Sequence, residues 1–320
     1  MFLSFSNFNK ILSNNFFCEK NPKLAVGVSG GPDSIALCIL LNQWVKKKKG
    51  YLVALIVDHR VRTESLYESK QTENFLKNQG INCKVLFVSK TRVKDAKLSQ
   101  SRINRFGKLL TYCKKHKIFY LFLGHHYDDN LETFILRKLA GSNFEGLNSM
   151  QFLKIFNNIQ FIRPLLSYSK KDILLFNKKL NLSFINDPSN QNIKYSRSAV
   201  REYLISDNKI KKEINKEFKF VKSNYLSYKK MIFQLLNLLI LKIELDKLTL
   251  NSKDFFKLNL EIKSNLLIKA IQYVHNSSIQ IRSNKINDLI IKISKFKKIS
   301  LKSNKTSICR NYDTIIITKC

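Results

Sequence analysis

The chain has 320 residues, enough for two or three domains, and its 44% hydrophobic and 11% aromatic content excludes an intrinsically disordered protein. Its 57 basic residues against 23 acidic ones give a formal net charge of +34, which predicts a polyanionic partner such as nucleic acid. The six cysteines are scattered, without the paired spacing of a zinc site or a disulfide framework, which is typical of a reducing cytosol.

The sequence predicts no membrane segment. The first ten residues lack the basic start and the long apolar core of a signal peptide. The most apolar later stretch, residues 231–245, is interrupted by Gln234, Asn237, Lys242 and Glu244 and is too short to span a bilayer. We therefore expect a cytoplasmic protein without a membrane partner.

Residues 24–166 alternate between apolar runs and helical patterns. The sequence predicts strands at 24–28, 52–57, 84–88, 120–123 and about 161–166, and helices at 34–47, 64–78, 101–116 and 128–139. Continuous apolar runs are typical of strands that are buried on both faces, as in parallel sheets. The alternation predicts an α/β fold with a doubly wound, mainly parallel sheet.

Beyond Pro164 the pattern becomes mainly helical. Ser167 is expected to cap a helix that ends at Leu180, and a turn-rich loop follows at 186–190. We expect helices at about 196–243, 252–275 and 283–296, and short strands at 299–301, 307–310 and 314–318. The predicted organisation is a catalytic domain over residues 1–205, a helical domain over 206–297 and a short β-rich segment over 298–320.

The first motif that carries chemistry lies between the first predicted strand and the first predicted helix after it. Two glycines without Cβ atoms let backbone N–H groups approach a phosphate, and the positive end of the helix points into the same space. The lysine of a Walker loop is absent. A phosphate-binding loop is predicted, with an ordinary strand-to-helix turn as the alternative; its residues are Ser29, Gly30, Gly31, Pro32, Asp33 and Ser34.

This S-G-G-x-D-S pattern resembles the signature of the N-type ATP pyrophosphatases, which cleave ATP between the α- and β-phosphates. The resemblance implies ATP as the nucleotide, together with Mg²⁺. The second predicted strand ends in Asp58 and His59. Ligands of open α/β sheets lie beyond the carboxyl ends of the strands, so both residues are expected beside the nucleotide, unless they are only a polar strand end.

The most informative segment, residues 124–133, follows the fourth predicted strand and reads GHHYDDNLET. Asp129 and Glu132 are three residues apart and Asp128 and Glu132 four apart, so they share a helix face. Acidic residues also suit the first turn of any helix, which is the structural alternative, and the spacing is not that of an H-E-x-x-H zinc site. We expect the segment, His125 included, to combine contact with ATP and capture of a cationic amine.

The same segment is similar to the H-H-x-D-D-Q-x-E-T motif of the tRNA(Ile)-lysidine synthetase family, with Asn130 in place of glutamine. Further matches follow in order between about residues 22 and 205. They are an A-R-x-x-R-[YF] pattern at 101–106, a glycine-rich stretch at 141–150, R-P-L-L at 163–166, D-x-S-N at 187–190 and an R-N-x-x-R pattern at 197–201. Ser101 and Ser198 depart from the family's alanine and asparagine.

The resemblance implies a reaction that ligates free L-lysine to the wobble cytidine in the anticodon of isoleucine tRNA, through an adenylated cytidine. Its implied catalytic residues are Asp33, Asp128, Asp129, Glu132, Arg102 and Arg105. A carboxylate must bind lysine and help to remove its proton, and the sequence leaves open which one does so. The two arginines would stabilise the adenylate or grip the anticodon backbone.

Arg197 and Arg201, four residues apart, are expected to contact RNA, and the basic helical domain to carry most of the sequence-independent tRNA contact. The family also suggests a homodimer. The alternative functions are a PP-loop tRNA thiolase, a non-RNA amide-forming pyrophosphatase and a non-catalytic tRNA-binding protein.

Overall fold

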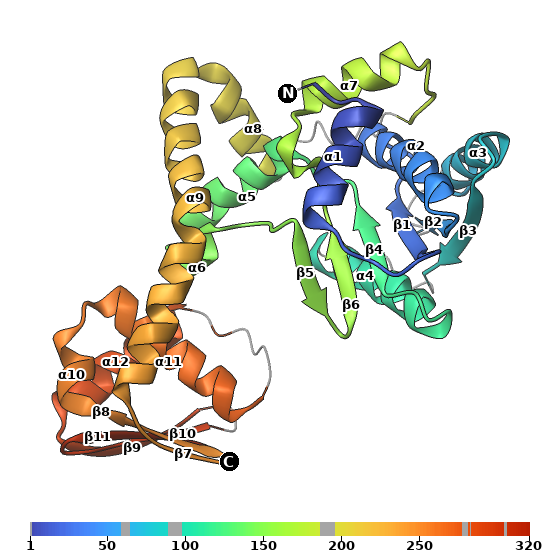
Figure 1. Cartoon of the computed structure of the whole chain (residues 1–320). Helices are drawn as coiled ribbons and strands as arrows, with labels where there is room; N and C mark the ends of the chain where they lie inside the picture. Colours follow the sequence, from blue (N-terminus) through green and yellow to red (C-terminus); the bar gives the residue numbers. More distant parts are fainter. Residues whose placement is uncertain are drawn as a thin grey trace. The chain divides into compact units, whose positions relative to one another are not determined.

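The structure, a computed structural model, describes residues 2–58, 65–88, 98–185, 196–276, 281, 283–303 and 306–320; for residues 98–102, 196–197, 205–206, 283 and 303 it describes the backbone alone. The chain divides into two compact units that interleave in the sequence (Figure 1). The first unit comprises Met1–Thr133 and Met150–Ser206, and the second comprises Phe134–Ser149 and Asp207–Cys320. The sequence-based division at residues 205 and 297 stays a prediction.

The first unit contains a six-stranded sheet in the order β3-β2-β1-β4-β6-β5. The pairs β3–β2, β2–β1, β1–β4 and β4–β6 are parallel, and β5 is antiparallel to β6, which confirms the doubly wound, mainly parallel sheet. The strands are β1 (Lys23–Val28), β2 (Tyr51–Asp58), β3 (Asn82–Phe87), β4 (Tyr120–Leu123), β5 (Leu153–Phe156) and β6 (Ile159–Ile162).

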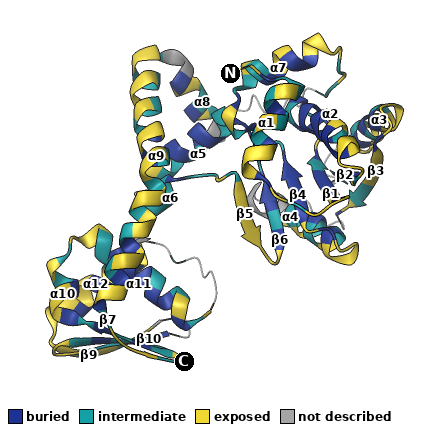
Figure 2. Ribbon diagram, in the orientation of Figure 1, coloured by how far each residue is buried: buried dark blue, intermediate teal, exposed yellow. Residues whose placement is uncertain are grey.

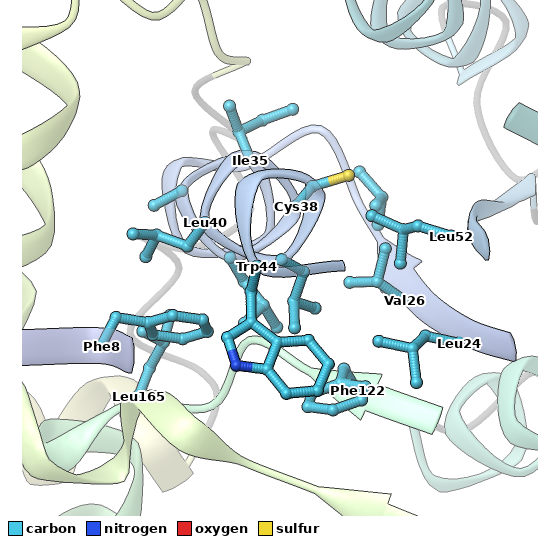
Figure 3. Packing of buried hydrophobic residues seen from close by; sticks show 14 of the residues in the cluster. Phe8, Leu24, Val26, Ile35, Cys38, Leu40, Trp44, Leu52, Phe122 and Leu165 are labelled. Carbon is cyan, nitrogen blue, oxygen red and sulfur yellow. The ribbon is translucent and has the colours of Figure 1, made fainter. Parts of the chain in front are cut away.

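Alternate residues of β1 and β2 enter two different hydrophobic clusters, one on each face of the sheet. Leu24 and Val26 pack with α1 (Phe5–Asn15), α2 (Pro32–Lys47) and α7 (Lys170–Lys179), around Trp44 (Figure 3). Ala25, between them, packs with Leu109 of α4 (Leu98–Lys115) in the other cluster. These strands are therefore buried on both sides (Figure 2), as the continuous apolar runs predicted.

Three details of the first unit differ from the sequence-based expectations. The strand predicted at 161–166 ends at Ile162, because Pro164 cannot donate to a ladder and instead starts a 3-10 helix, η2 (Pro164–Ser167). The cap of α7 is Ser169 rather than Ser167, since Ser169 forms a capping box with Asp172. Helix α1 and strand β5 were not predicted. The remaining helices are α3 (Ser65–Asn78), α5 (Tyr127–Leu139, shared with the second unit) and α8 (Ser196–Ser206).

The second unit packs helices against an antiparallel five-stranded sheet in the order β7-β8-β11-β10-β9. The helix predicted to reach residue 243 ends at Leu239, and the apolar residues that follow form the edge strand β7 of a hairpin. The elements of the second unit are α6 (Phe144–Leu147), α9 (Asn208–Leu239), β7 (Ile240–Glu244), β8 (Lys247–Asn251), α10 (Ser252–Lys257), α11 (Leu260–Val274), α12 (Ser283–Lys295), β9 (Lys298–Ser303), β10 (Thr306–Asn311) and β11 (Thr314–Lys319). Among the described residues, no helix has the length and apolar character needed to cross a membrane.

A buried polar network connects three helical segments of the second unit. Asn265 of α11 is fully buried, accepts a hydrogen bond from the Nδ2 of Asn143 at 2.6 Å, and donates to the hydroxyl of Tyr228 at 2.6 Å and to the carbonyl of Glu261 at 3.1 Å. The network attaches the start of α6 to α9 and α11. Segment 134–149 is thus held within the second unit although its neighbours in sequence belong to the first.

We predict that Asn265→Ala lowers the free energy of unfolding of the second unit by about 2–3 kcal/mol, because it leaves buried partners without hydrogen bonds. Trp44, the only tryptophan, lies in the core of the first unit, so its fluorescence reports on that unit alone. Urea titrations should show an earlier transition by far-UV circular dichroism and an unchanged Trp44 transition. Asn224→Ala, at an exposed position of α9, should stay within about 0.5 kcal/mol of the parent. An equal shift of the Trp44 transition would contradict this assignment.

Candidate active site

The loop between β1 and α2 is closed by its own hydroxyl groups. The Oγ of Ser34 donates to the carbonyl of Gly31 at 2.9 Å and accepts from the N–H of Ser29 at 3.2 Å, and the two serine hydroxyls lie 3.3 Å apart. Pro32 occupies the first turn of α2, where a missing N–H costs nothing. The loop is therefore preformed, with the amino end of a sixteen-residue helix directly behind it.

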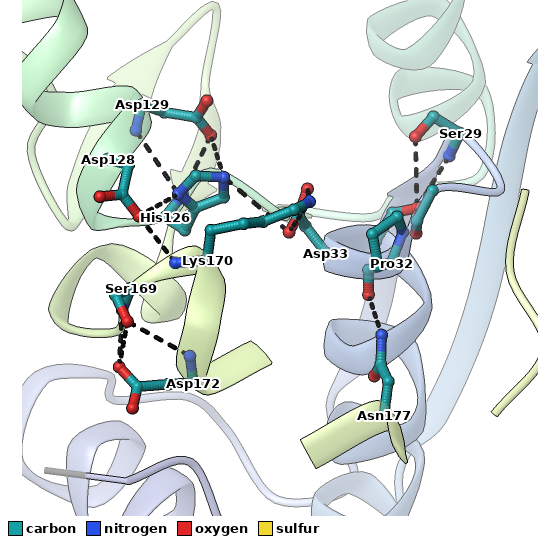
Figure 4. A network of polar contacts seen from close by, with 12 residues as sticks. Ser29, Pro32, Asp33, His126, Asp128, Asp129, Ser169, Lys170, Asp172 and Asn177 are labelled. Carbon is teal, nitrogen blue, oxygen red and sulfur yellow. Dashed lines mark hydrogen bonds and ion pairs between the residues drawn. The ribbon is translucent and has the colours of Figure 1, made fainter. Parts of the chain in front are cut away.

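Gly30 is the position at which the loop requires glycine. Its φ of +82° is in the left-handed region, and a Cβ there would lie 2.7 Å from the Oγ1 of Thr72. The carbonyl of Gly30 accepts from the N–H of Ile185 at 2.9 Å. The fully buried Asn177 of α7 donates from Nδ2 to the carbonyl of Pro32 at 3.0 Å (Figure 4). Hydrogen bonds from Asn177 of α7 and from Ile185, in the chain after α7, thus hold the loop, and the sequence analysis anticipated neither.

The acidic helix α5 begins beside this loop because β4, which precedes it, pairs with β1. At Gly124, just after β4, a Cβ would lie 3.1 Å from the backbone nitrogen of Ser34 and 3.2 Å from the carbonyl of Asp33. Only glycine allows this approach of two backbones without a shift. The first turns of α2 and α5 therefore come together at the carboxyl end of the sheet.

His126 joins the carboxylates of the two helices (Figure 4). Its Nε2 lies 3.8 Å from Asp33 and 3.5 Å from Asp129, and its Nδ1 lies 3.6 Å from Asp128. The N–H of His126 also donates to Asp129 at 3.2 Å. His126 is buried, whereas the three aspartates are partly exposed. The sequence analysis singled out the neighbouring, half-buried His125 and did not include His126; the fold decides which ring of the pair faces the acids.

Lys170 is the second site residue that the sequence analysis missed. Its ammonium lies 2.7 Å from both carboxylate oxygens of Asp33, and its backbone N–H donates to Asp128 at 2.7 Å. The capping box of Ser169 and Asp172 fixes this end of α7, and the hydrogen bond from the Ser169 hydroxyl holds the pKa of Asp172 below its usual value. One residue of α7 therefore contacts an acid of α2 and an acid of α5.

Glu132 and Arg201 form the tightest ion pair of the site. Glu132 is 2% exposed, and it accepts from the Nε of Arg201 at 2.5 Å and from its Nη2 at 3.3 Å. Arg201 of α8 also lies 3.8 Å from Asp129. The hydrogen bond to Glu132 raises the pKa of Arg201. The sequence assigned Arg201 to RNA contact, but in the structure its guanidinium is directed at two acids of α5.

Asn130, which stands where the family has glutamine, holds the backbone. It is buried, accepts from the N–H of Met150 at 2.8 Å and donates to the carbonyl of Met150 at 3.1 Å. Met150 is the residue at which the chain returns to the first unit after segment 134–149. The shorter side chain therefore closes this excursion beside the acidic turn.

The remaining predicted site residues lie outside this network or outside the described residues. Asp58 is buried and accepts from the Oγ of Ser65 at 2.9 Å, a contact within its own strand-to-helix connection. Arg105 lies on α4 with its guanidinium 5.5 Å from the ring centre of Phe106. His59 and the side chains of Arg102 and Arg197 lie outside the described residues.

We predict that Arg201→Met lowers the free energy of unfolding by about 2–3 kcal/mol at neutral pH, because the buried Glu132 carboxylate loses the cation that is paired with it. Arg201 is itself partly exposed, which keeps the loss below the 3–5 kcal/mol of fully buried pairs. Arg201→Met with Glu132→Gln should recover most of the stability in urea titrations. A loss of equal size in the double variant would refute the pairing.

Comparison with known proteins places this site in a family. Residues 4–208 match the family model described as a PP-loop domain. A tRNA(Ile)-lysidine synthase from Orientia tsutsugamushi is 38% identical over 188 residues, which are 59% of this chain and 42% of that protein. Another, from Wolbachia sp. subsp. Brugia malayi, is 31% identical over 298 residues, which are 90% of this chain and 67% of that protein. The chain thus spans less than half of the Orientia relative and about two thirds of the Wolbachia one.

Among solved structures, the U34-tRNA thiolase NcsA from Methanococcus maripaludis, determined with its [4Fe-4S] cluster, superposes with a TM-score of 0.57 at 19% identity, over 70% of this chain and 78% of that one. This likeness shows a shared fold and says nothing of the chemistry. Since the family model covers well over half of the chain and the Wolbachia relative is matched over two thirds of its length, the chain belongs to the PP-loop family and, within it, to the tRNA(Ile)-lysidine synthases.

Proposed function

We propose that this protein ligates L-lysine to the 2-position of the wobble cytidine in the CAU anticodon of isoleucine tRNA, with release of AMP and pyrophosphate from ATP. The observation that carries the proposal is the meeting of two motifs in one site. Asp33 of the phosphate-type loop lies within 3.8 Å of His126, which in turn contacts Asp128 and Asp129 of the acidic helix. Nucleotide activation and amine capture can therefore occur side by side.

The nucleotide half is the loop and the amino end of α2. The backbone of Gly30 and Gly31, the hydroxyls of Ser29 and Ser34, and the helix end suit the oxygens of a triphosphate. In the first step the cytosine 2-oxygen attacks the α-phosphorus, the bond to the bridging oxygen breaks, and pyrophosphate leaves. The adenylated oxygen is then a good leaving group, whereas the original carbonyl oxygen is not.

Magnesium fits this site only when it shares its ligands with ATP. Among the described residues, no group of three or more His, Cys, Asp or Glu side chains could hold a metal ion by itself. Mg²⁺ characteristically takes one or two carboxylates together with substrate phosphates and water. Asp33, partly exposed at the start of α2, is the carboxylate placed to do so. When bound there, Mg²⁺ would neutralise charge on the phosphate oxygens.

The lysine half is the first turn of α5. The carboxylates of this turn attract the ammonium of lysine, and one of them takes the proton that the amine must lose before it attacks C2 of the base and displaces AMP. Among the described residues, the partners of the Asp128 carboxylate are the backbone N–H of Lys170 and the ring of His126, and its side chain is 34% exposed. Asp129 is 15% exposed and lies beside the Arg201 guanidinium. Asp128 is therefore the better candidate for lysine, with Asp129 and Glu132 shaping the pocket.

The RNA partner follows from charge and family. A net charge of +34 attracts the phosphate backbone of tRNA, and Arg102, Arg105 and Arg197 are the proposed contacts from α4 and α8. Arg201 is left out of this set because its guanidinium is paired with Glu132. The proposed setting is the cytoplasm, where tRNA, ATP and lysine occur together. A homodimer remains part of the proposal on the family resemblance alone.

The burial of the cysteine nearest the loop in sequence argues against sulfur transfer by this protein. All six are free thiols, and Cys38, which follows the loop in α2, is fully buried, so burial raises the pKa of its thiol. A thiolase would require a reactive thiol or a cluster at the site. Total tRNA incubated with ATP and labelled lysine should gain label, whereas a thiolase or a passive tRNA-binding protein would leave lysine free.

We predict that Asp33→Ala abolishes lysine incorporation and tRNA-stimulated pyrophosphate release, because the loop loses its only carboxylate. Affinity for tRNA, measured by filter binding, should change less than twofold. Asp313→Ala, an exposed acid of the second unit, serves as the control and should retain full turnover. Turnover by the Asp33→Ala variant would show that residues 29–34 are not the ATP-binding loop.

We predict that Asp128→Asn raises the KM for lysine by about 10- to 100-fold with a smaller change in the KM for ATP, since a charge-assisted contact to the ammonium is lost. Asp129→Asn should raise it less, because that carboxylate also faces Arg201. Steady-state kinetics with varied lysine distinguishes the two. If Asp129→Asn has the larger effect, the assignment to Asp128 is wrong.

A further inference from the structure

The phosphate-type loop of this chain contains no cation, but a lysine from another part of the fold lies against it. Walker loops carry a lysine within their own sequence that reaches the β- and γ-phosphates. Here residues 29–34 offer serines, glycines and an acid. The ammonium of Lys170, 137 residues downstream of Asp33, lies 2.7 Å from both oxygens of its carboxylate.

The position of this ammonium suits a phosphate as well as a carboxylate. Asp33 is in the first turn of α2, the end at which a helix attracts anions. An ammonium has three N–H donors, and two of them reach Asp33; among the described residues the third has no acceptor. The side chain is 38% exposed and is thus open to a ligand bound at the loop.

The reaction also needs a positive group at this place. When the bond between the α-phosphorus and the bridging oxygen breaks, the electron pair moves onto the β-phosphate, and the departing pyrophosphate gains charge. A cation placed beforehand stabilises that charge more than it stabilises intact ATP. Among the residues that the structure describes, Lys170 is the lysine whose ammonium is joined to the loop aspartate.

We propose that Lys170 is the phosphate-binding cation of this loop: its ammonium contacts the β- and γ-phosphates of ATP and stays with pyrophosphate as it leaves. Lys170 remains protonated and forms no covalent bond. The inference rests on the proposed function for the identity of the nucleotide. It adds that the α7 residue completes a loop that the local sequence leaves without a positive charge.

The geometry permits a clean test, because Lys170 holds Asp128 through its backbone N–H and Asp33 through its side chain. Lys170→Met removes the ammonium and leaves the contact to Asp128 in place. Lys171→Met, the adjacent and exposed lysine of the same helix, is the matched control. Lys170→Arg restores a cation at the same position. Thermal unfolding of each variant reports whether the fold is kept.

Binding of inorganic pyrophosphate, ATP and AMP to the full chain should be measured by calorimetry with Mg²⁺ and without tRNA or lysine. Lys170→Met should weaken pyrophosphate and ATP by about 10- to 100-fold and leave AMP unchanged, because AMP lacks the β- and γ-phosphates. Lys170→Arg should recover most of the affinity, and Lys171→Met should match the parent protein. Lower kcat for pyrophosphate release should accompany the loss.

Three results would overturn the inference: unchanged pyrophosphate binding in Lys170→Met, equal weakening of AMP and pyrophosphate, or tighter ATP binding. The second would mean that Lys170 only supports the loop, and the third that it blocks Asp33. A parent protein that binds pyrophosphate through Lys170 but incorporates no lysine would refute the proposed function alone. Lysine incorporation together with Lys170-independent pyrophosphate binding would refute this inference alone.

Discussion

The close approach of Gly124 to the first turn of α2 is the constraint on which the site depends. A Cβ at this position would come within 3.2 Å of the backbone of Asp33 and Ser34, so any other residue would push the start of α2 away from the turn that leads into α5 by a few tenths of an ångström. The parallel pairing of β1 with β4 provides the register, and Gly124 allows the helix ends that follow these strands to meet. The distances from His126 to the acids of both helices result from this approach.

Helices α2, α5 and α7 begin at the site, and each has an acidic residue in its first turn. Asp33 in α2, Asp128 and Asp129 in α5, and Asp172 in α7 all benefit from the positive end of their helices. Such a concentration of carboxylates needs cations, and Lys170 and Arg201 provide them from α7 and α8. The site is thus a cluster of carboxylates with two cations paired to it, within a strongly basic chain. The ammonium of a lysine substrate can therefore contact a carboxylate, and a phosphate of ATP can contact a cation, within the same site.

The acidic helix also connects the two units of the chain, because α5 starts in the first and ends in the second. Within the first unit, Asn130 fixes the returning backbone at Met150. Within the second, Arg137 donates to the carbonyls of Gly146 and Ser149, and Lys222 donates to that of Asn148. Because the Lys222 ammonium is buried beside the carbonyl of Asn148, its pKa is lowered to about 8. The excursion thus leaves the first unit as part of the regular helix α5, whereas side chains hold its return at Met150.

Features with a local pattern could be predicted from the sequence: the apolar runs of a parallel sheet, the glycine loop, the acidic turn and the charge that favours RNA. It was less informative wherever a contact joins distant segments. It did not show that His126 rather than His125 faces the acids, since both rings follow the same strand and only the path of the chain orients them. It did not identify Lys170, Asn177 or the pairing of Glu132 with Arg201, because these partners are separated by 69 to 145 residues. Helix periodicity reports which face is buried, whereas the partner on that face is set by strand order, and strand order is a property of the folded sheet.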